Sequence, residues 1–107
     1  MSDAVDQSLV EAVKAGDAVA VARALADGAD PNAAVDRFGR SAIIEAAHRG
    51  RLDVVGVLVD AGACVGPVGH FQVSPLRVAM LEAHTGVVEY LIAHGALAAE
   101  SATRRAC

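Results

Sequence analysis

The sequence is poor in aromatic residues. Its 107 residues include no Trp, one Tyr and two Phe, although 54% of them are hydrophobic. The core must therefore be built from Ala, Val, Leu and Ile, and these smaller side chains let packed helices approach closely. The length is that of one small domain.

Basic residues and long apolar runs are also scarce. Nine Lys plus Arg against 13 Asp plus Glu give a net charge of −4, which argues against a nucleic-acid partner, because such partners need a basic surface. The apolar stretches fall short of the ~18–20 residues that span a bilayer, and the first residues do not form a signal peptide, so no membrane association is expected.

Cysteine is limited to Cys64 and Cys107, and two such residues do not form a disulfide framework. We expect two inert thiols in a reducing compartment, which indicates a cytoplasmic protein. One Lys against eight Arg, together with many Ala and Gly residues, is typical of a GC-rich bacterial genome.

A repeat with a period of 33 residues organises the chain. The pattern V-V-x-x-L-[VI]-x-x-G-A occupies residues 54–63 and returns without a gap at residues 87–96, and Gly28-Ala29 ends an earlier, similar segment. A period of this length is typical of a solenoid, in which helix pairs that cannot bury their apolar faces alone stack on one another.

Helix start and stop signals divide each repeat into two helices. The expected helices cover about 8–15, 19–27, 41–49, 52–61, 75–83 and 85–94. Ser8 and Glu11 form a capping box that predicts the start of the first helix after a frayed segment 1–7. Ser41 and Ser74 are expected N-caps, and Gly28 is the expected left-handed end of the second helix.

Two short stretches carry a family signature. Residues 41–46 read S-A-I-I-E-A and residues 74–79 read S-P-L-R-V-A; both resemble T-P-L-H-x-A of the ankyrin repeat. The resemblance implies an all-α solenoid of three helix-turn-helix repeats with short β-hairpin or extended fingers. Its His is replaced by Ile44 and Arg77, so the hydrogen bonds of that His are lost. The turn glycine Gly39 becomes Gln72 in the third repeat.

The same resemblance divides the chain into units. The single domain, 1–107, comprises repeats at about 8–33, 36–67 and 69–99 and a tail at 100–107.

In ankyrin repeats the partner usually binds the concave face, which the finger tips and the first helices form. Carried over by position, the candidate partner-binding residues are Arg37, Phe38, Arg40, His48, Arg49, His70, Phe71, Val73, Leu81 and Glu82. Lys14 and Val68 belong to the same face. Phe38 and Phe71 occupy equivalent finger tips and could anchor a partner; alternatively, each ring packs back on its own hairpin. The Arg residues could equally form a merely solvated face.

Catalytic and metal-binding patterns are weak. The histidines (His48, His70, His84 and His94) form no i,i+4 pair and have no accompanying Cys cluster, so we expect no metal and no cofactor. Gly62, Gly66 and Gly69 lack the spacing of a phosphate-binding loop. We therefore expect that the protein is not an enzyme.

The function predicted from these patterns is a protein–protein interaction module, which presents its finger tips rigidly and acts as an inhibitor, an immunity-type protein or an adaptor. The alternative is a structural or self-associating unit, either a homodimer or a fragment of a longer repeat array. A homodimer through the C-terminal repeat would cover the apolar residues Met80, Leu81, Val88 and Leu91, which no fourth repeat covers.

Overall fold

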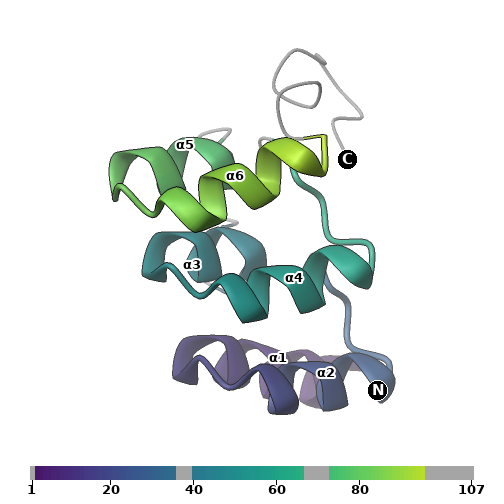
Figure 1. Cartoon of the computed structure of the whole chain (residues 1–107). Helices are drawn as coiled ribbons and strands as arrows, with labels where there is room; N and C mark the ends of the chain where they lie inside the picture. Colours follow the sequence, from purple (N-terminus) through teal and green to yellow (C-terminus); the bar gives the residue numbers. More distant parts are fainter. Residues whose placement is uncertain (1, 36–39, 67–72, 96–107) are drawn as a thin grey trace.

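The computed structural model describes residues 2–35, 40–66 and 73–95, which form three stacked pairs of helices (Figure 1). The helices are α1 (Ser2–Ala15), α2 (Ala18–Ala26), α3 (Ala42–Arg49), α4 (Leu52–Asp60), α5 (Pro75–Leu81) and α6 (Thr85–Ala93). The described segments contain no extended strand; an antiparallel bridge joins Ala34 to Ser41 in the connector before α3. The predicted all-α solenoid is confirmed.

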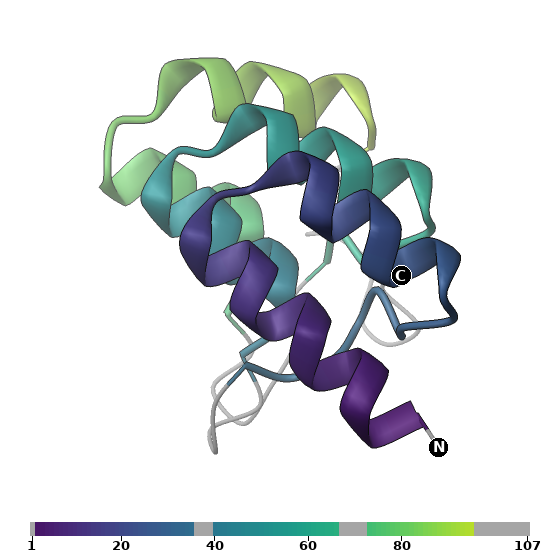
Figure 2. The same cartoon turned by 90° about the horizontal axis from the view of Figure 1, so that it is seen from below.

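The helices form two parallel rows. The first helices, α1, α3 and α5, pack against one another in that order, and α2, α4 and α6 form the second row (Figure 2). A single helix pair would leave one of its apolar faces exposed to solvent. The neighbouring pairs in the stack bury this face.

The turn inside each pair contains one left-handed residue. Gly16, Gly50 and Ala83 have φ angles of 73°, 71° and 60°. Such a residue lets the chain leave the first helix and start the second within a few residues. Gly28, where the sequence predicts the end of α2, also has a positive φ of 104°.

The core lies between the two rows and is densest in the middle repeat. Residues 42–47 of α3 are all buried, because repeats cover this helix on both sides. Ile44, which replaces the signature His, is fully buried. An apolar side chain therefore takes the place of a hydrogen-bonded one.

The start of α1 differs from the prediction. The helix begins at Ser2 rather than at Ser8, which lies inside it, so the capping box is wrong, and so is the frayed segment over its described residues, 2–7. Val5 packs against the core, and the backbone N–H of Asp30 donates a 2.8 Å hydrogen bond to Oδ1 of Asp6. The first contact holds the early turns of the helix against the core, and the second ties them to the connector that follows α2.

Ser41 and Ser74 are the N-caps of α3 and α5, as predicted, but only Ser74 forms the capping bond. Its Oγ accepts a hydrogen bond of 3.1 Å from the backbone N–H of Arg77. The buried Oγ of Ser41 has no hydrogen-bond partner in the part of the chain that the structure describes.

The last repeat is less exposed than the sequence indicates. Leu91 is fully buried and Val88 is half-buried against the core, so neither belongs to an open apolar end. Met80 and Leu81 do remain exposed. α6 packs against its partner helix α5 and against α4 of the preceding repeat, and Leu91 belongs to the core that forms there.

Two further observations concern the environment of the chain. Cys64 is disulfide-bonded, so the expectation of an inert free thiol is wrong at this position. Among the helices of residues 2–35, 40–66 and 73–95, none has the length and apolar character required to cross a bilayer.

Candidate functional site

A groove runs along the row of first helices. It is an open hollow of about 750 Å³ and draws residues from all three repeats. Its lining consists of Lys14, Val35, Arg40, Glu45, His48, Arg49, Arg51 and His84. We refer to these eight residues as the groove.

The groove is positively charged on a negatively charged protein. Four of its side chains are cationic, two are imidazoles and one is a carboxylate, which gives a formal charge of +3 with neutral histidines. The whole chain carries −4. Positive charge is therefore concentrated in this groove, and a concave surface of one sign focuses the electric field on an incoming ligand of the opposite sign.

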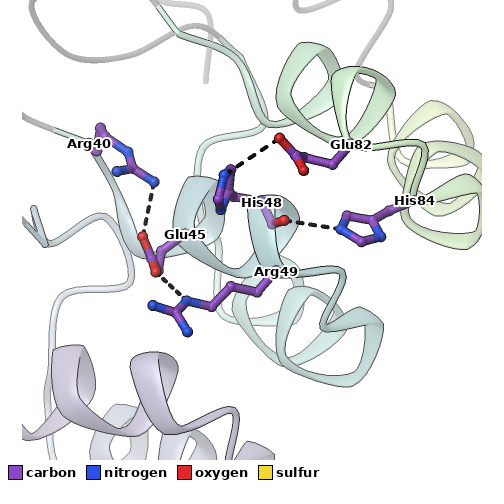
Figure 3. A network of polar contacts seen from close by, with 6 residues as sticks. All are labelled: Arg40, Glu45, His48, Arg49, Glu82 and His84. Carbon is purple, nitrogen blue, oxygen red and sulfur yellow. Dashed lines mark hydrogen bonds and ion pairs between the residues drawn. The ribbon is translucent and has the colours of Figure 1, made fainter.

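The carboxylate of Glu45 organises two of the arginines. Glu45 is only 7% exposed on α3; its Oε1 accepts a 2.9 Å hydrogen bond from Arg40, and its Oε2 pairs with Nε of Arg49 (Figure 3). Both arginine side chains remain partly exposed, at 34% and 47%. Glu45 thus fixes their position while leaving one net positive charge in the trio.

The third repeat contacts the second through two histidines. Nε2 of His48 lies 3.6 Å from a carboxylate oxygen of Glu82 in the turn after α5. Nε2 of His84, which precedes α6, lies 3.0 Å from the backbone oxygen of His48 (Figure 3). In the tautomer that carries the proton on Nε2, His84 donates a hydrogen bond to the C-terminal turn of α3.

The first repeat contributes a lysine and a surface on which Arg51 lies. Lys14 is exposed in the last turn of α1. The guanidinium of Arg51 covers Gly16, because a Cβ atom at Gly16 would lie 2.5 Å from its Nε. Within the described residues neither Lys14 nor Arg51 forms an ion pair.

The candidate residues from the sequence are placed as follows. Arg40, His48 and Arg49 line the groove. Glu82 pairs with His48, and Leu81 is 83% exposed beside it. Val73 is half-buried and packs against the core. The remaining candidates lie outside the described residues: Arg37, Phe38, His70 and Phe71.

Sequence reasoning missed four groove residues: Val35, Glu45, Arg51 and His84. For Arg51 and His84 a signal existed. Each directly follows the left-handed residue that ends a first helix, and the two are 33 residues apart. For Glu45 the signal was Arg49 at i+4, a spacing that brings opposite charges together on a helix.

Two further features of the described residues concern metal ligands and titratable groups. In the described segments no three His, Cys, Asp or Glu side chains gather in a way that could hold a metal ion. On the second row of helices, partial burial, and secondarily the carboxylate of Asp60, raises the pKa of Tyr90. Tyr90 stacks on His94 with ring centroids 4.1 Å apart, a packing role away from the groove.

Comparisons with known proteins agree with this architecture. A family model described as "Ankyrin repeats (3 copies)" matches residues 9–101. Among curated proteins, the 2-5A-dependent ribonuclease of Mus musculus is 43% identical over 58 residues, which is 54% of this chain. The matched region covers 8% of the length of that enzyme.

Proposed function

The chain belongs to the ankyrin repeat family, whose repeats generally mediate protein–protein interaction, and from that membership we propose that it binds a partner protein in the groove. The observation that carries this proposal is the groove itself. A hollow of about 750 Å³ with a formal charge of +3 stands on a protein of charge −4.

The mechanism is binding by a surface that is already formed. The two arginines are held by Glu45, and the histidines tie the second repeat to the third. Since these side chains are fixed before the partner arrives, little ordering entropy is lost on binding. Such a rigid module can act as an inhibitor or immunity-type protein that covers another protein's active surface, or as an adaptor.

Affinity capture from the source cells tests the proposal. The wild-type chain, Arg51→Glu and Arg23→Glu serve as baits, with mass spectrometry as the readout. Arg23 is exposed on α2, in the other row of helices, so its charge reversal is a matched control. We expect a stoichiometric partner that is captured by wild type and Arg23→Glu and lost with Arg51→Glu.

The second candidate function is self-association. Met80 and Leu81 are 59% and 83% exposed at the end of α5, and exposed apolar side chains that lie together often mark an interface. Light scattering tests this role. A homo-oligomer that contains no other protein, and that dissociates when Met80→Ser and Leu81→Ser are combined, would favour self-association over the binding module.

The location of the protein is a further part of the proposal. The sequence indicates the cytoplasm, whereas a disulfide such as that of Cys64 is rare in a reducing compartment. Alkylation of thiols during cell lysis, followed by mass spectrometry, distinguishes a reducing from an oxidising compartment. A Cys64 that is alkylated without prior reduction supports the cytoplasm, and a protected Cys64 supports an oxidising compartment.

A further inference from the structure

We infer that the segment of the partner that enters the groove is extended, with carboxylates over the first two repeats and an apolar side chain over the third. This inference rests on the proposed function and names the chemistry that the partner must present. It follows from the gradient of side-chain character along the row of first helices, which supplies part of the groove lining and continues past it to Leu81.

Equivalent positions of the three repeats form one row. Lys14, His48 and Leu81 each lie two residues before the left-handed residue that ends a first helix. Their helices, α1, α3 and α5, pack side by side in this order (Figure 2). All three residues are exposed. The row therefore changes from a cation to an imidazole to an aliphatic side chain along the stack.

The first two repeats supply the cations that an acidic segment needs. Lys14 and Arg51 form no ion pair within the described residues, so no carboxylate there has to be displaced from them. Arg49 is held by Glu45 with its side chain 47% exposed. A carboxylate that enters here gains charge-assisted hydrogen bonds, which are about twice as strong as neutral ones.

The third repeat repels carboxylates and offers an apolar contact instead. Leu81 is 83% exposed, and the adjacent Glu82 has 46% of its side chain exposed. A like charge placed opposite Glu82 is disfavoured, and this gives the bound segment one direction. The apolar side chain of the partner must then lie over Leu81, and its carboxylates over Lys14 of the first repeat and Arg49 of the second.

The repeat spacing sets the sequence pattern of the bound segment. Packed helices lie ~8–10 Å apart, and an extended chain advances ~3.3 Å per residue. One repeat therefore corresponds to about three residues of the partner. The expected pattern is two acidic residues and one apolar residue at intervals of about three positions.

Selection from a random dodecapeptide phage library tests the inference on the full chain. The baits are wild type, Lys14→Glu and Leu81→Ser, with Arg23→Glu and Met80→Ser as controls. Lys14 and Arg23 both lie in the last turn of a helix, so the cost to the helix dipole is matched. Leu81 and Met80 are both exposed on α5, so the loss of apolar surface is comparable.

We expect selected peptides with the acidic, acidic, apolar pattern. Lys14→Glu and Leu81→Ser should each lower the affinity for synthetic copies of the selected peptides by about tenfold. The two control substitutions should lower this affinity by less than about twofold. Their affinity should also fall as NaCl is raised, because exposed charge pairs are screened.

Three results would overturn the inference. These are selected peptides that are neutral or basic, no selected peptide at all, and acidic peptides that bind Lys14→Glu as tightly as wild type. The inference would also fail if a fluorescein-labelled single-stranded RNA 12-mer bound the groove more tightly than every peptide. The ligand would then be a nucleic acid rather than an acidic segment of a protein. Any of these results could occur while a partner is still captured by the wild type and lost with Arg51→Glu. In that case the proposed function is retained, and only the inferred chemistry of the bound segment is wrong.

Discussion

The imidazole of His84 covers Gly50 of the preceding repeat, and its Nε2 lies 3.0 Å from the backbone oxygen of His48. Arg51 covers Gly16 in the same way one repeat earlier. The turns of the first and second repeats are thus each covered by the residue that directly follows the turn of the next repeat. In the last repeat the corresponding turn residue is Ala83, which retains the left-handed conformation at φ 60°.

We expect Gly50→Ala to destabilise the protein more than Gly16→Ala. Both glycines have φ near 70°, at 71° and 73°, so the cost of a left-handed Ala is shared, at about 1 kcal/mol. A Cβ at Gly50 would lie 2.6 Å from Nδ1 of His84, a ring held by its hydrogen bond, whereas at Gly16 it meets the flexible end of Arg51. Urea unfolding measures the difference.

Gly62→Ala provides the baseline for this comparison. Gly62 has φ 96°, and nothing lies within 4 Å of its Cβ position. Its substitution therefore reports backbone strain alone. A loss for Gly50→Ala no larger than that for Gly16→Ala, which has nearly the same φ, would mean that the contact between His84 and Gly50 carries no energy.

We expect opposite consequences of removing the two buried hydroxyls. Ser74→Ala should cost about 1 kcal/mol, because Oγ caps α5 through the N–H of Arg77. Ser41→Ala should be neutral or stabilising, because no described group bonds to that buried Oγ. Thermal unfolding of the two variants checks this, and a clear loss with Ser41→Ala would reveal a partner for its hydroxyl.

Asn32 should contribute to the coupling between the first two repeats. Its Oδ1 accepts a 2.6 Å hydrogen bond from the backbone N–H of Cys64, a residue that is only 3% exposed. Asn32→Ala leaves this buried donor unpaired, and we expect a loss of about 1–3 kcal/mol. Hydrogen exchange at the Cys64 amide should quicken in parallel.

Asn32→Asp is the matched control, because a carboxylate oxygen can accept the same bond. It should recover most of the stability and the slow exchange of the Cys64 amide. If Asn32→Asp exchanges as fast as Asn32→Ala, the side-chain oxygen is not the acceptor.

Glu45→Gln should lower stability only modestly although Glu45 is buried. Its partners Arg40 and Arg49 keep 34% and 47% of their side chains exposed, so water can solvate both once the carboxylate is gone. We expect a loss of about 1 kcal/mol, near the upper end for exposed ion pairs. Glu89→Gln, an exposed position on α6, is the control and should change the unfolding free energy by less than about 0.5 kcal/mol.

The effect of Glu45→Gln on binding is separable from its effect on stability. The variant raises the formal charge of the groove from +3 to +4 but releases two arginines from their fixed positions. If prior positioning governs affinity, the captured partner should bind more weakly in spite of the added positive charge. Tighter binding would show that total charge matters more than geometry.

The sequence alone determined the architecture. A 33-residue period, read with the helix start and stop signals, predicts helix pairs that stack, and the observed helices from α2 to α6 end within a few residues of the expected bounds. These features depend on rules that act along a short stretch of chain. The spacing of apolar side chains sets the helices, Pro75 starts α5 where its missing N–H costs nothing, and Gly28 adopts the positive φ that follows the end of α2. Together with the ankyrin resemblance, this register assigns Lys14, His48 and Arg49 to the row of first helices and Arg40 to the connector before α3.

Only the tertiary structure decided the contacts between repeats. The start of α1 depends on a bond between Asp6 and Asp30, which are 24 positions apart. Arg51 and His84 reach the groove because each repeat places the first residue after its turn over the repeat before it. The burial of Leu91 follows from packing in the second row of helices. Propensity and periodicity act within one helix, whereas these contacts depend on how one helix pair is set against the next.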